Sequence, residues 1–162
     1  MGRHKALLPL NGTPIIVAHT RTLLSVCPRV IVVLGSEAER IVPELPAGTD
    51  VIVNPNWAQS HMSDSLQLAL SQTSGTVIVT PVDVPPARKE LLDALLASTL
   101  PAVPHFNSVP GHPVAFDAPR ILSRLQEGHL QQALEHSNAV HTKCADCIRS
   151  WNTPEEWTAW TQ

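Results

Sequence analysis

Asp83 is the residue whose surroundings best suit catalytic chemistry. It comes shortly after the apolar run 77–79 and is flanked by prolines at positions 81, 85 and 86. A carboxylate on backbone that prolines restrict can hold a divalent cation against a polyphosphate. Asp is also preferred just before a helix, where its side chain caps the helix. The residues alone leave these two interpretations about even.

Lys5 and His112 are weaker candidates when each is taken alone. Lys5 precedes an apolar stretch, and its ammonium could act as a point charge on phosphate, although a lysine near a chain end is more often only solvated. His112 lies in the turn Gly-His-Pro at 111–113, which leads into a strand and could present the imidazole to a pocket. A structural histidine is the simpler interpretation of that tripeptide by itself.

Two cysteines and three tryptophans near the carboxyl end favour structural roles. Cys144 and Cys147, with a histidine at 141, have the spacing of half a zinc site, but the chain has no second pair to complete it. We therefore expect Cys144 and Cys147 to be ordinary thiols rather than part of a zinc or redox centre. Trp151, Trp157 and Trp160 could stack bases, but the three-residue spacing of the last two predicts a helix that buries them.

The order of the apolar runs predicts an α/β fold in three layers, with a mostly parallel sheet between helices. The run 30–34 is continuously β-branched or Leu, which is typical of a strand covered on both faces. The polar side of the first predicted helix includes His19. Asp83 falls at the carboxyl end of a strand, where such sheets bind ligands. Strands are predicted at 30–34, 50–53, 75–80, 102–103, 114–116 and 139–142, and helices at 14–26, from 36, through 66–70, at 87–98, 119–125, 130–136 and from 153.

Length and composition limit the classes of function. The 162 residues contain no repeat or long linker, so we expect one domain over residues 1–162. Eleven Lys and Arg against 14 Asp and Glu give a net charge of -3, which disfavours binding to nucleic acid through bulk charge. No apolar run approaches the roughly 20 residues of a membrane span, so no membrane partner is expected. Three cysteines favour a reducing cytoplasm over secretion.

Five segments, in order, resemble motifs of one enzyme family. They are Met-Gly-Arg-His-Lys at 1–5 with the Gly12 and Pro14 turn, Asn-Pro-Asn-Trp-Ala-Gln at 54–59 with Ser65, Thr-Pro-Val-Asp-Val-Pro at 80–85, Gly-His-Pro-Val at 111–114, and Trp-Asn-Thr-Pro-Glu-Glu-Trp at 151–157. Together they resemble the molybdenum cofactor cytidylyltransferases and guanylyltransferases, which belong to the NTP-transferase superfamily. Five ordered matches along nearly the whole chain are much more specific than any one of them.

The resemblance implies a Rossmann-like nucleotidyltransferase fold and a Mg²⁺-dependent reaction. A terminal phosphate of molybdopterin would attack the α-phosphorus of CTP or GTP, with CMP transfer favoured over GMP transfer, and pyrophosphate would leave. The resemblance also implies contact with a molybdoenzyme chaperone as a further expectation. It assigns Asp83 and Asn152 to the metal, Lys5 and Asp83 to catalysis, and Lys5, Asn54, Ser65 and His112 to the nucleotide or its acceptor.

The resemblance leaves one part of the family's pattern unmatched. In the family a buried strand and a glycine-rich phosphate loop with an arginine precede the Met-Gly pair, which here is Met1 and Gly2. We therefore expect an N-terminally truncated form of the fold with unpaired strand edges in the middle of its sheet, and a gene product that begins further upstream. Two alternatives agree with the same residues: a non-catalytic nucleotide-binding relative, and a nucleotidyltransferase acting on a sugar or another acceptor.

Overall fold

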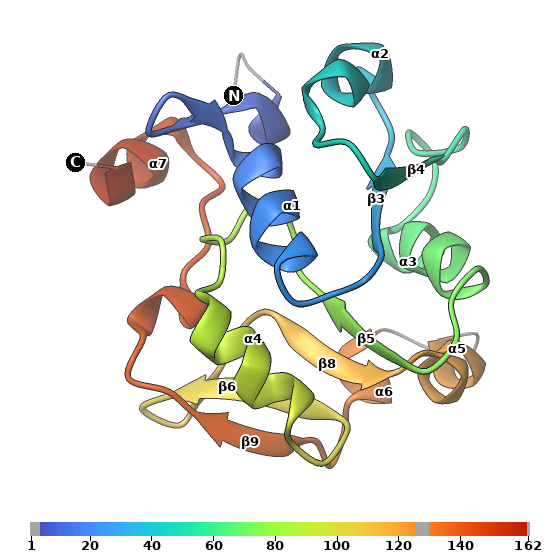
Figure 1. The fold of residues 1–162 in the computed structure, drawn as a ribbon, viewed down its shortest axis with the longest axis vertical. Coiled ribbons are helices and arrows are strands. Elements are labelled where there is room, and N and C mark those ends of the chain that lie inside the picture. Colours follow the sequence, from blue (N-terminus) through green and yellow to red (C-terminus); the bar gives the residue numbers. More distant parts are fainter. Residues whose placement is uncertain (1–3, 126–129, 162) are drawn as a thin grey trace.

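The computed structural model describes residues 4–125 and 130–161, in which helices and strands alternate along the chain (Figure 1). The helices are α1 (Ile15–Leu24), α2 (Ala38–Ile41), α3 (Met62–Leu70), α4 (Lys89–Leu96), α5 (Ala118–Leu125), α6 (Leu130–Ala133) and α7 (Pro154–Thr161), with 3-10 turns η1 (Lys5–Leu7), η2 (Val42–Glu44) and η3 (Ala145–Ile148). The strands are β1 (Pro9–Leu10), β2 (Thr13–Pro14), β3 (Val30–Leu34), β4 (Thr49–Val53), β5 (Thr76–Val79), β6 (Ala102–Phe106), β7 (Val109–Pro110), β8 (Val114–Asp117) and β9 (Asn138–His141).

The α/β class is confirmed, and β8 is the main departure from the predicted mostly parallel order. β3 pairs parallel with β4, and β9 pairs parallel with β6, whereas β8 runs antiparallel between β5 and β6. The reason is the length of the connections. A parallel pair needs a crossover of a dozen or more residues, and only seven residues, 107–113, separate β6 from β8. β5 and β6 point the same way because α4 lies in the longer connection between them.

β3 and β5 each have an open edge. β3 forms a two-stranded sheet with β4. β5 is an edge strand of the sheet ordered β5-β8-β6-β7, in which β9 also pairs with β6. Within the described residues, β3 and β5 therefore each pair along one edge only, and no strand joins the two sheets.

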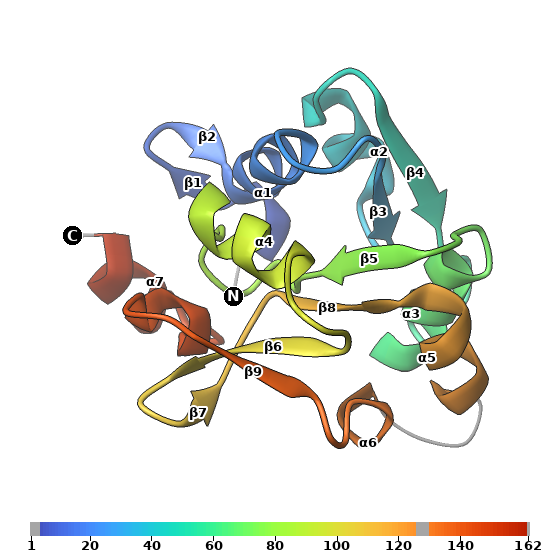
Figure 2. The ribbon, with the colours of Figure 1, turned by 60° about the horizontal axis from the view of Figure 1, so that its bottom comes forward.

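Helices cover both faces of the larger sheet, as successive side chains of β8 show. Val114 and Phe116 pack on the face covered by α3, α5 and α6, while Ala115 lies between them in sequence and packs against α4 on the opposite face. This period of two is the ordinary geometry of a strand buried on both sides. Figure 2 shows α4 on one side of β5, β8 and β6, with α3 and α5 on the other.

The three carboxyl-terminal tryptophans form a cluster with the first part of the chain. Trp151 is 1 % exposed, stacks on Trp160 at a centroid distance of 4.7 Å and meets Trp157 edge-on at 4.9 Å. Leu8 and Ile15 complete the cluster. The prediction that these tryptophans are core residues is confirmed for Trp151 and Trp157, while Trp160 is partly buried, and their packing holds α7 near the start of α1 and the β1–β2 hairpin (Figure 1). None of the helices in the described ranges is long and apolar enough to cross a membrane.

The Gly-His-Pro turn at 111–113 rests directly on the backbone of η3. His112 N–H donates to the Cys147 carbonyl at 2.7 Å, and Gly111 N–H donates to the Pro104 carbonyl at 2.9 Å. A Cβ atom added at Gly111 would lie 2.1 Å from the Cys147 carbonyl oxygen, far inside van der Waals contact. Glycine is therefore required here by close approach of two backbone segments.

Gly111→Ala is expected to destabilise the protein by roughly 1–3 kcal/mol, the usual cost of overpacking, because either the turn or η3 must move. Urea unfolding measures the loss, and Val109→Ala, an exposed change two residues away, is the matched control. Equal unfolding midpoints for wild type and Gly111→Ala would contradict the close approach.

Candidate functional site

Three of the residues singled out in the sequence meet at one point. The Lys5 ammonium lies 2.9 Å from Asn152 Oδ1 and 3.4 Å from Asp83 Oδ2. Lys5 comes from η1, Asp83 from the segment after β5, and Asn152 from the segment before α7. The Lys5 and Asp83 side chains are 31 % and 27 % exposed, so a ligand from solvent can reach the pair. The structure thus brings together a carboxylate, an amide oxygen and an ammonium from three distant parts of the chain.

The backbone around Asp83 is held on both sides by hydrogen bonds. The Trp151 N–H donates to the Asp83 carbonyl at 3.0 Å. His19 on α1 is 4 % exposed, and its Nε2 lies 2.9 Å from the Val84 carbonyl. Since a carbonyl only accepts, Nε2 carries the proton in this bond. Burial lowers the pKa of His19 to about 4, although the Val84 bond and the nearby Asp83 charge both raise it.

Asn152 is held by a helix cap. The Glu156 carboxylate accepts hydrogen bonds from Asn152 N–H at 2.5 Å and Thr153 N–H at 3.1 Å, while Glu156 N–H donates to Thr153 Oγ1 at 3.2 Å. This reciprocal arrangement is a capping box at the start of α7. The two backbone donors, Asn152 first, lower the pKa of Glu156 below its usual range, and the Lys5 charge adds to this. Glu156 therefore fixes the backbone that carries the Asn152 side chain.

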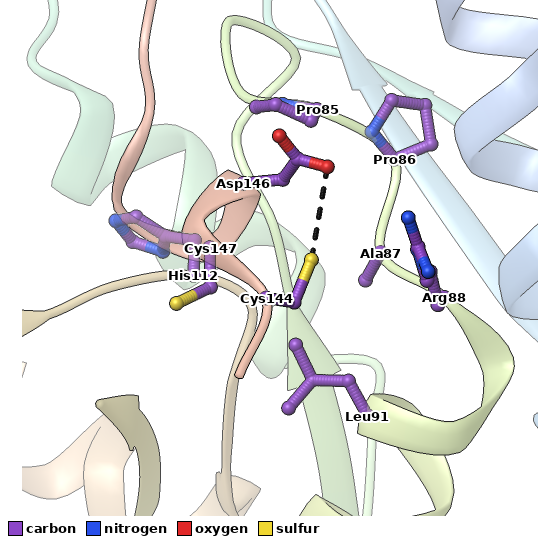
Figure 3. A pocket seen from close by; sticks show the side chains of 9 residues that line it. All are labelled: Pro85, Pro86, Ala87, Arg88, Leu91, His112, Cys144, Asp146 and Cys147. Carbon is purple, nitrogen blue, oxygen red and sulfur yellow. Dashed lines mark hydrogen bonds between the residues drawn. The ribbon is translucent and has the colours of Figure 1, made fainter. Parts of the chain in front are cut away.

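His112 lies near Asp83 and lines a small cavity. Burial lowers the pKa of His112, and the Asp83 charge opposes that shift. Its Nδ1 is buried without a hydrogen-bond partner among the described residues. The adjoining cavity has a volume of about 10 Å³, which is the space of about one water, so a nucleotide cannot enter it. Figure 3 shows the Cys144 thiol in this cavity pointing at Asp146, with an Sγ–Oδ2 distance of 3.7 Å.

Asn54 and Ser65 form a second polar cluster. Asn54 is 2 % exposed, and its amide donates to Ser60 Oγ at 2.8 Å and to Ser65 Oγ at 3.0 Å while accepting from Asn56 N–H at 2.9 Å. The bonds to Ser60 and Asn56 hold the loop after β4 together, and the bond to Ser65 ties it to the start of α3. Among the described residues, no hydrogen bond or ion pair links this cluster to Lys5, Asp83 or Asn152.

Two positioning residues were missed by the sequence analysis. His19 was placed on the polar side of its helix, and this prediction is wrong because α4 and the Val84 segment cover that side of α1. Glu156 was overlooked as a site residue, although Thr-x-x-Glu at 153–156 is a readable capping signal. The burial of His19 had no signal of this kind, since a neutral histidine in a helix fits either face.

The oxygen donors at this point suit a hard divalent cation. Asp83 supplies a carboxylate oxygen and Asn152 an amide oxygen, and both already face one positive group, the Lys5 ammonium. No cluster of three or more His, Cys, Asp or Glu that could hold a metal occurs in the ranges 4–125 and 130–161. Mg²⁺ commonly binds through one or two carboxylates together with water and substrate phosphates. The donor set therefore fits an ion that is held jointly with a polyphosphate.

Two comparisons of the sequence with known proteins both give matches to transferases. A family model described as the MobA-like NTP transferase domain matches residues 1–144. The molybdenum cofactor cytidylyltransferase of Escherichia coli K12 is 22 % identical over 165 residues, covering 96 % of this chain and 86 % of that protein. Lys5, Asp83 and His112 lie within the range that the family model matches, and Asn152 and Glu156 lie after it.

Solved structures share the fold. A nucleotidyl transferase from Methanothermobacter superposes with a TM-score of 0.80 at 20 % identity, covering 98 % of this chain and 84 % of that one. The Rv0371c protein of Mycobacterium tuberculosis, in its complex with manganese, gives a TM-score of 0.75 at 20 % identity over 98 % of this chain and 91 % of that one. These likenesses confirm the Rossmann-like nucleotidyltransferase architecture.

The buried His19 makes stability depend on pH. The folded state keeps His19 neutral down to a pKa of about 4, whereas the unfolded chain takes up a proton near pH 6.5. Stability is therefore full above pH 6.5 and is lost as pH falls toward 4, by about 3 kcal/mol from this group. Urea unfolding at pH 7 and pH 4.5 measures the loss. His19→Gln, which keeps an N–H donor but does not titrate, should lose clearly less; equal losses in both proteins would refute the assignment.

The Glu156 cap is expected to hold α7 in place. Glu156→Ala removes the acceptor for two backbone N–H groups, so the thermal midpoint should fall by a few degrees, while Glu155→Ala, an exposed change at the preceding position, should leave it nearly unchanged. Because the folded pKa is lowered, the cap is complete above the ordinary Glu pKa of about 4.3 and is lost as pH falls through the folded value. Fluorescence of the tryptophan cluster reports both effects. Equal midpoints for the two variants would show that the cap does not matter.

Proposed function

The chain belongs to the family of MobA-like NTP transferase domains and is a nucleotidyltransferase, and from this premise we propose that it transfers CMP from CTP to the phosphate of a molybdopterin acceptor. Transfer of GMP from GTP is the less favoured form of the same reaction. Support for the acceptor and the base comes from the Escherichia coli relative, which is named a molybdenum cofactor cytidylyltransferase. The observation that carries the proposal is the Lys5 ammonium lying between the Asp83 and Asn152 side-chain oxygens.

In this proposal Asp83 and Asn152 hold Mg²⁺ through their side-chain oxygens. An ion held there would supply positive charge to offset the charge of the triphosphate and of the leaving pyrophosphate. Lys5 contributes a second positive group, with three N–H donors and no acceptor, which suits phosphate oxygens. His19 and Trp151 keep the Asp83 backbone in place, and Glu156 keeps Asn152 in place, so the charged groups need no rearrangement of the chain to face a phosphate.

The reaction itself is an in-line displacement at phosphorus. An oxygen of the acceptor phosphate forms a bond to the α-phosphorus of CTP, and the bond from that phosphorus to the bridging oxygen of pyrophosphate breaks. The protein contributes orientation and compensation of charge, and no covalent bond to a side chain is required.

The remaining predicted residues act at the edges of this site in the proposal. His112 is assigned to the acceptor side as a hydrogen-bonding group, and burial, which lowers its pKa, favours the neutral imidazole there. Ser65 Oγ accepts from Asn54, which leaves the Ser65 hydroxyl proton free to donate to the nucleotide or acceptor. Asn54 serves by holding the loop that presents Ser65. We place the reaction in the cytoplasm, with a molybdoenzyme chaperone as a further proposed partner.

Substitution of Asp83 tests the function. In a pyrophosphate-release assay with molybdopterin, wild type should turn over with Mg-CTP faster than with Mg-GTP. Asp83→Asn should lose on the order of 100-fold or more, since a charged group facing the transition state is removed. Asp93→Asn, an exposed carboxylate on α4 that pairs with Lys89, is the control and should keep full activity.

Two outcomes would contradict the proposal. Retained activity in Asp83→Asn would remove Asp83 from the reaction. Binding of CTP without pyrophosphate release on addition of molybdopterin would favour the non-catalytic or other-acceptor alternatives.

A further inference from the structure

The Lys5 ammonium occupies the position that a divalent cation would need. Its Nζ contacts Asn152 Oδ1 at 2.9 Å and Asp83 Oδ2 at 3.4 Å, and Asp83 and Asn152 are the side chains proposed to hold the metal. Lys5 is also the only basic side chain paired with Asp83 among the described residues. Without a metal, the ammonium therefore neutralises the carboxylate.

An ammonium and a divalent cation compete for these oxygens. Both groups are positive, and binding the same two side chains would hold them close together. Their repulsion would be screened only in part by water, because the Lys5 and Asp83 side chains are about one third exposed. An ion that enters must therefore displace Nζ. Conversely, as long as Nζ stays on Asp83 and Asn152, a free ion meets a site whose charge is already balanced.

The Lys5 side chain can leave while its backbone remains fixed. Ala6 is 2 % exposed and buried in the core, and the His4 side chain accepts the Ala6 N–H at 3.3 Å to cap η1. The ammonium itself is on a flexible four-carbon stem and is 31 % exposed. Nζ can therefore turn away from Asp83 without unfolding η1. A triphosphate offers it new oxygen partners that carry more negative charge than one carboxylate.

We propose that Lys5 is an exchangeable occupant of the cation site, which makes metal and nucleotide bind cooperatively. Nucleotide phosphates draw Nζ away from Asp83 and Asn152, and the freed oxygens then accept the metal. By linkage, the metal in turn raises affinity for the nucleotide. The site thus selects the metal–nucleotide complex over free divalent cations. This inference rests on the proposed function only in taking a nucleoside triphosphate as the ligand whose phosphates bind Lys5.

The test measures the affinity for Mn²⁺ in the absence of nucleotide. The electron paramagnetic resonance signal of free Mn²⁺ reports how much of the ion is unbound. Lys5→Met removes the ammonium and keeps the length of the side chain, so it should bind Mn²⁺ at least about tenfold more tightly than wild type, within the usual range of coupling between sites. Lys5→Arg keeps a permanent positive charge and should bind Mn²⁺ as weakly as wild type. Lys89→Met removes an exposed lysine that pairs with Asp93 and should have no effect.

Three results would overturn the inference. The first is equal Mn²⁺ affinity for Lys5→Met and wild type, because Lys5 would then not compete for the site. The second is tighter Mn²⁺ binding that persists in Lys5→Met combined with Asp83→Asn, because the ion would then bind elsewhere. The third is an absence of Mn²⁺ binding to all variants. Far-ultraviolet circular dichroism of each variant confirms that it is folded before titration.

The same titrations with CTP present separate this inference from the proposed function. In wild type, CTP should tighten Mn²⁺ binding by more than it does in Lys5→Met, because only wild type has an ammonium to displace. These measurements use no acceptor, so a protein that fails to act on molybdopterin can still show the exchange, and an active protein can fail to show it.

Discussion

A half-buried carboxylate needs a positive partner, and Asp83 is the point at which this requirement shapes the protein. The ammonium that balances it comes from the first helical turn of the described chain, while the amide that shares the ammonium comes from the segment before α7. Hydrogen bonds from Trp151 and His19 hold the backbone carbonyls of residues 83 and 84. One local charge is thus tied to α1, to the amino end and to the carboxyl end of the chain.

The packing around this point explains why distant segments meet there. The tryptophan cluster joins α7 to Leu8 and Ile15, and it lies next in sequence to Asn152. The Glu156 cap then sets the direction in which the chain passes from Trp151 into α7. Apolar burial brings the carboxyl-terminal segment to the site, and the cap aligns its polar atoms. Nucleotidyl transfer depends on such alignment, because its main demand is compensation of phosphate charge at fixed positions.

The parts of this arrangement that follow from local chemistry could be read from the sequence. Asp83 after a strand, Lys5 before an apolar stretch and the buried tryptophans were predicted from residue type and spacing, and Asn152 from the resemblance. The antiparallel direction of β8 was not predicted, because the direction of a strand depends on the path of the connection that precedes it. The burial of His19 was also missed, since it results from packing against residues 65 positions away. That Lys5 touches both Asp83 and Asn152 is likewise a property of the folded chain alone.

The most direct measurement is a crystal structure with Mn²⁺ and CTP, using the anomalous scattering of manganese to locate the ion. The account predicts an anomalous peak within ligand distance of Asp83 and Asn152, with Lys5 Nζ turned from these oxygens onto the triphosphate. A peak at another position, with Nζ still in contact with Asp83 and Asn152, would contradict it.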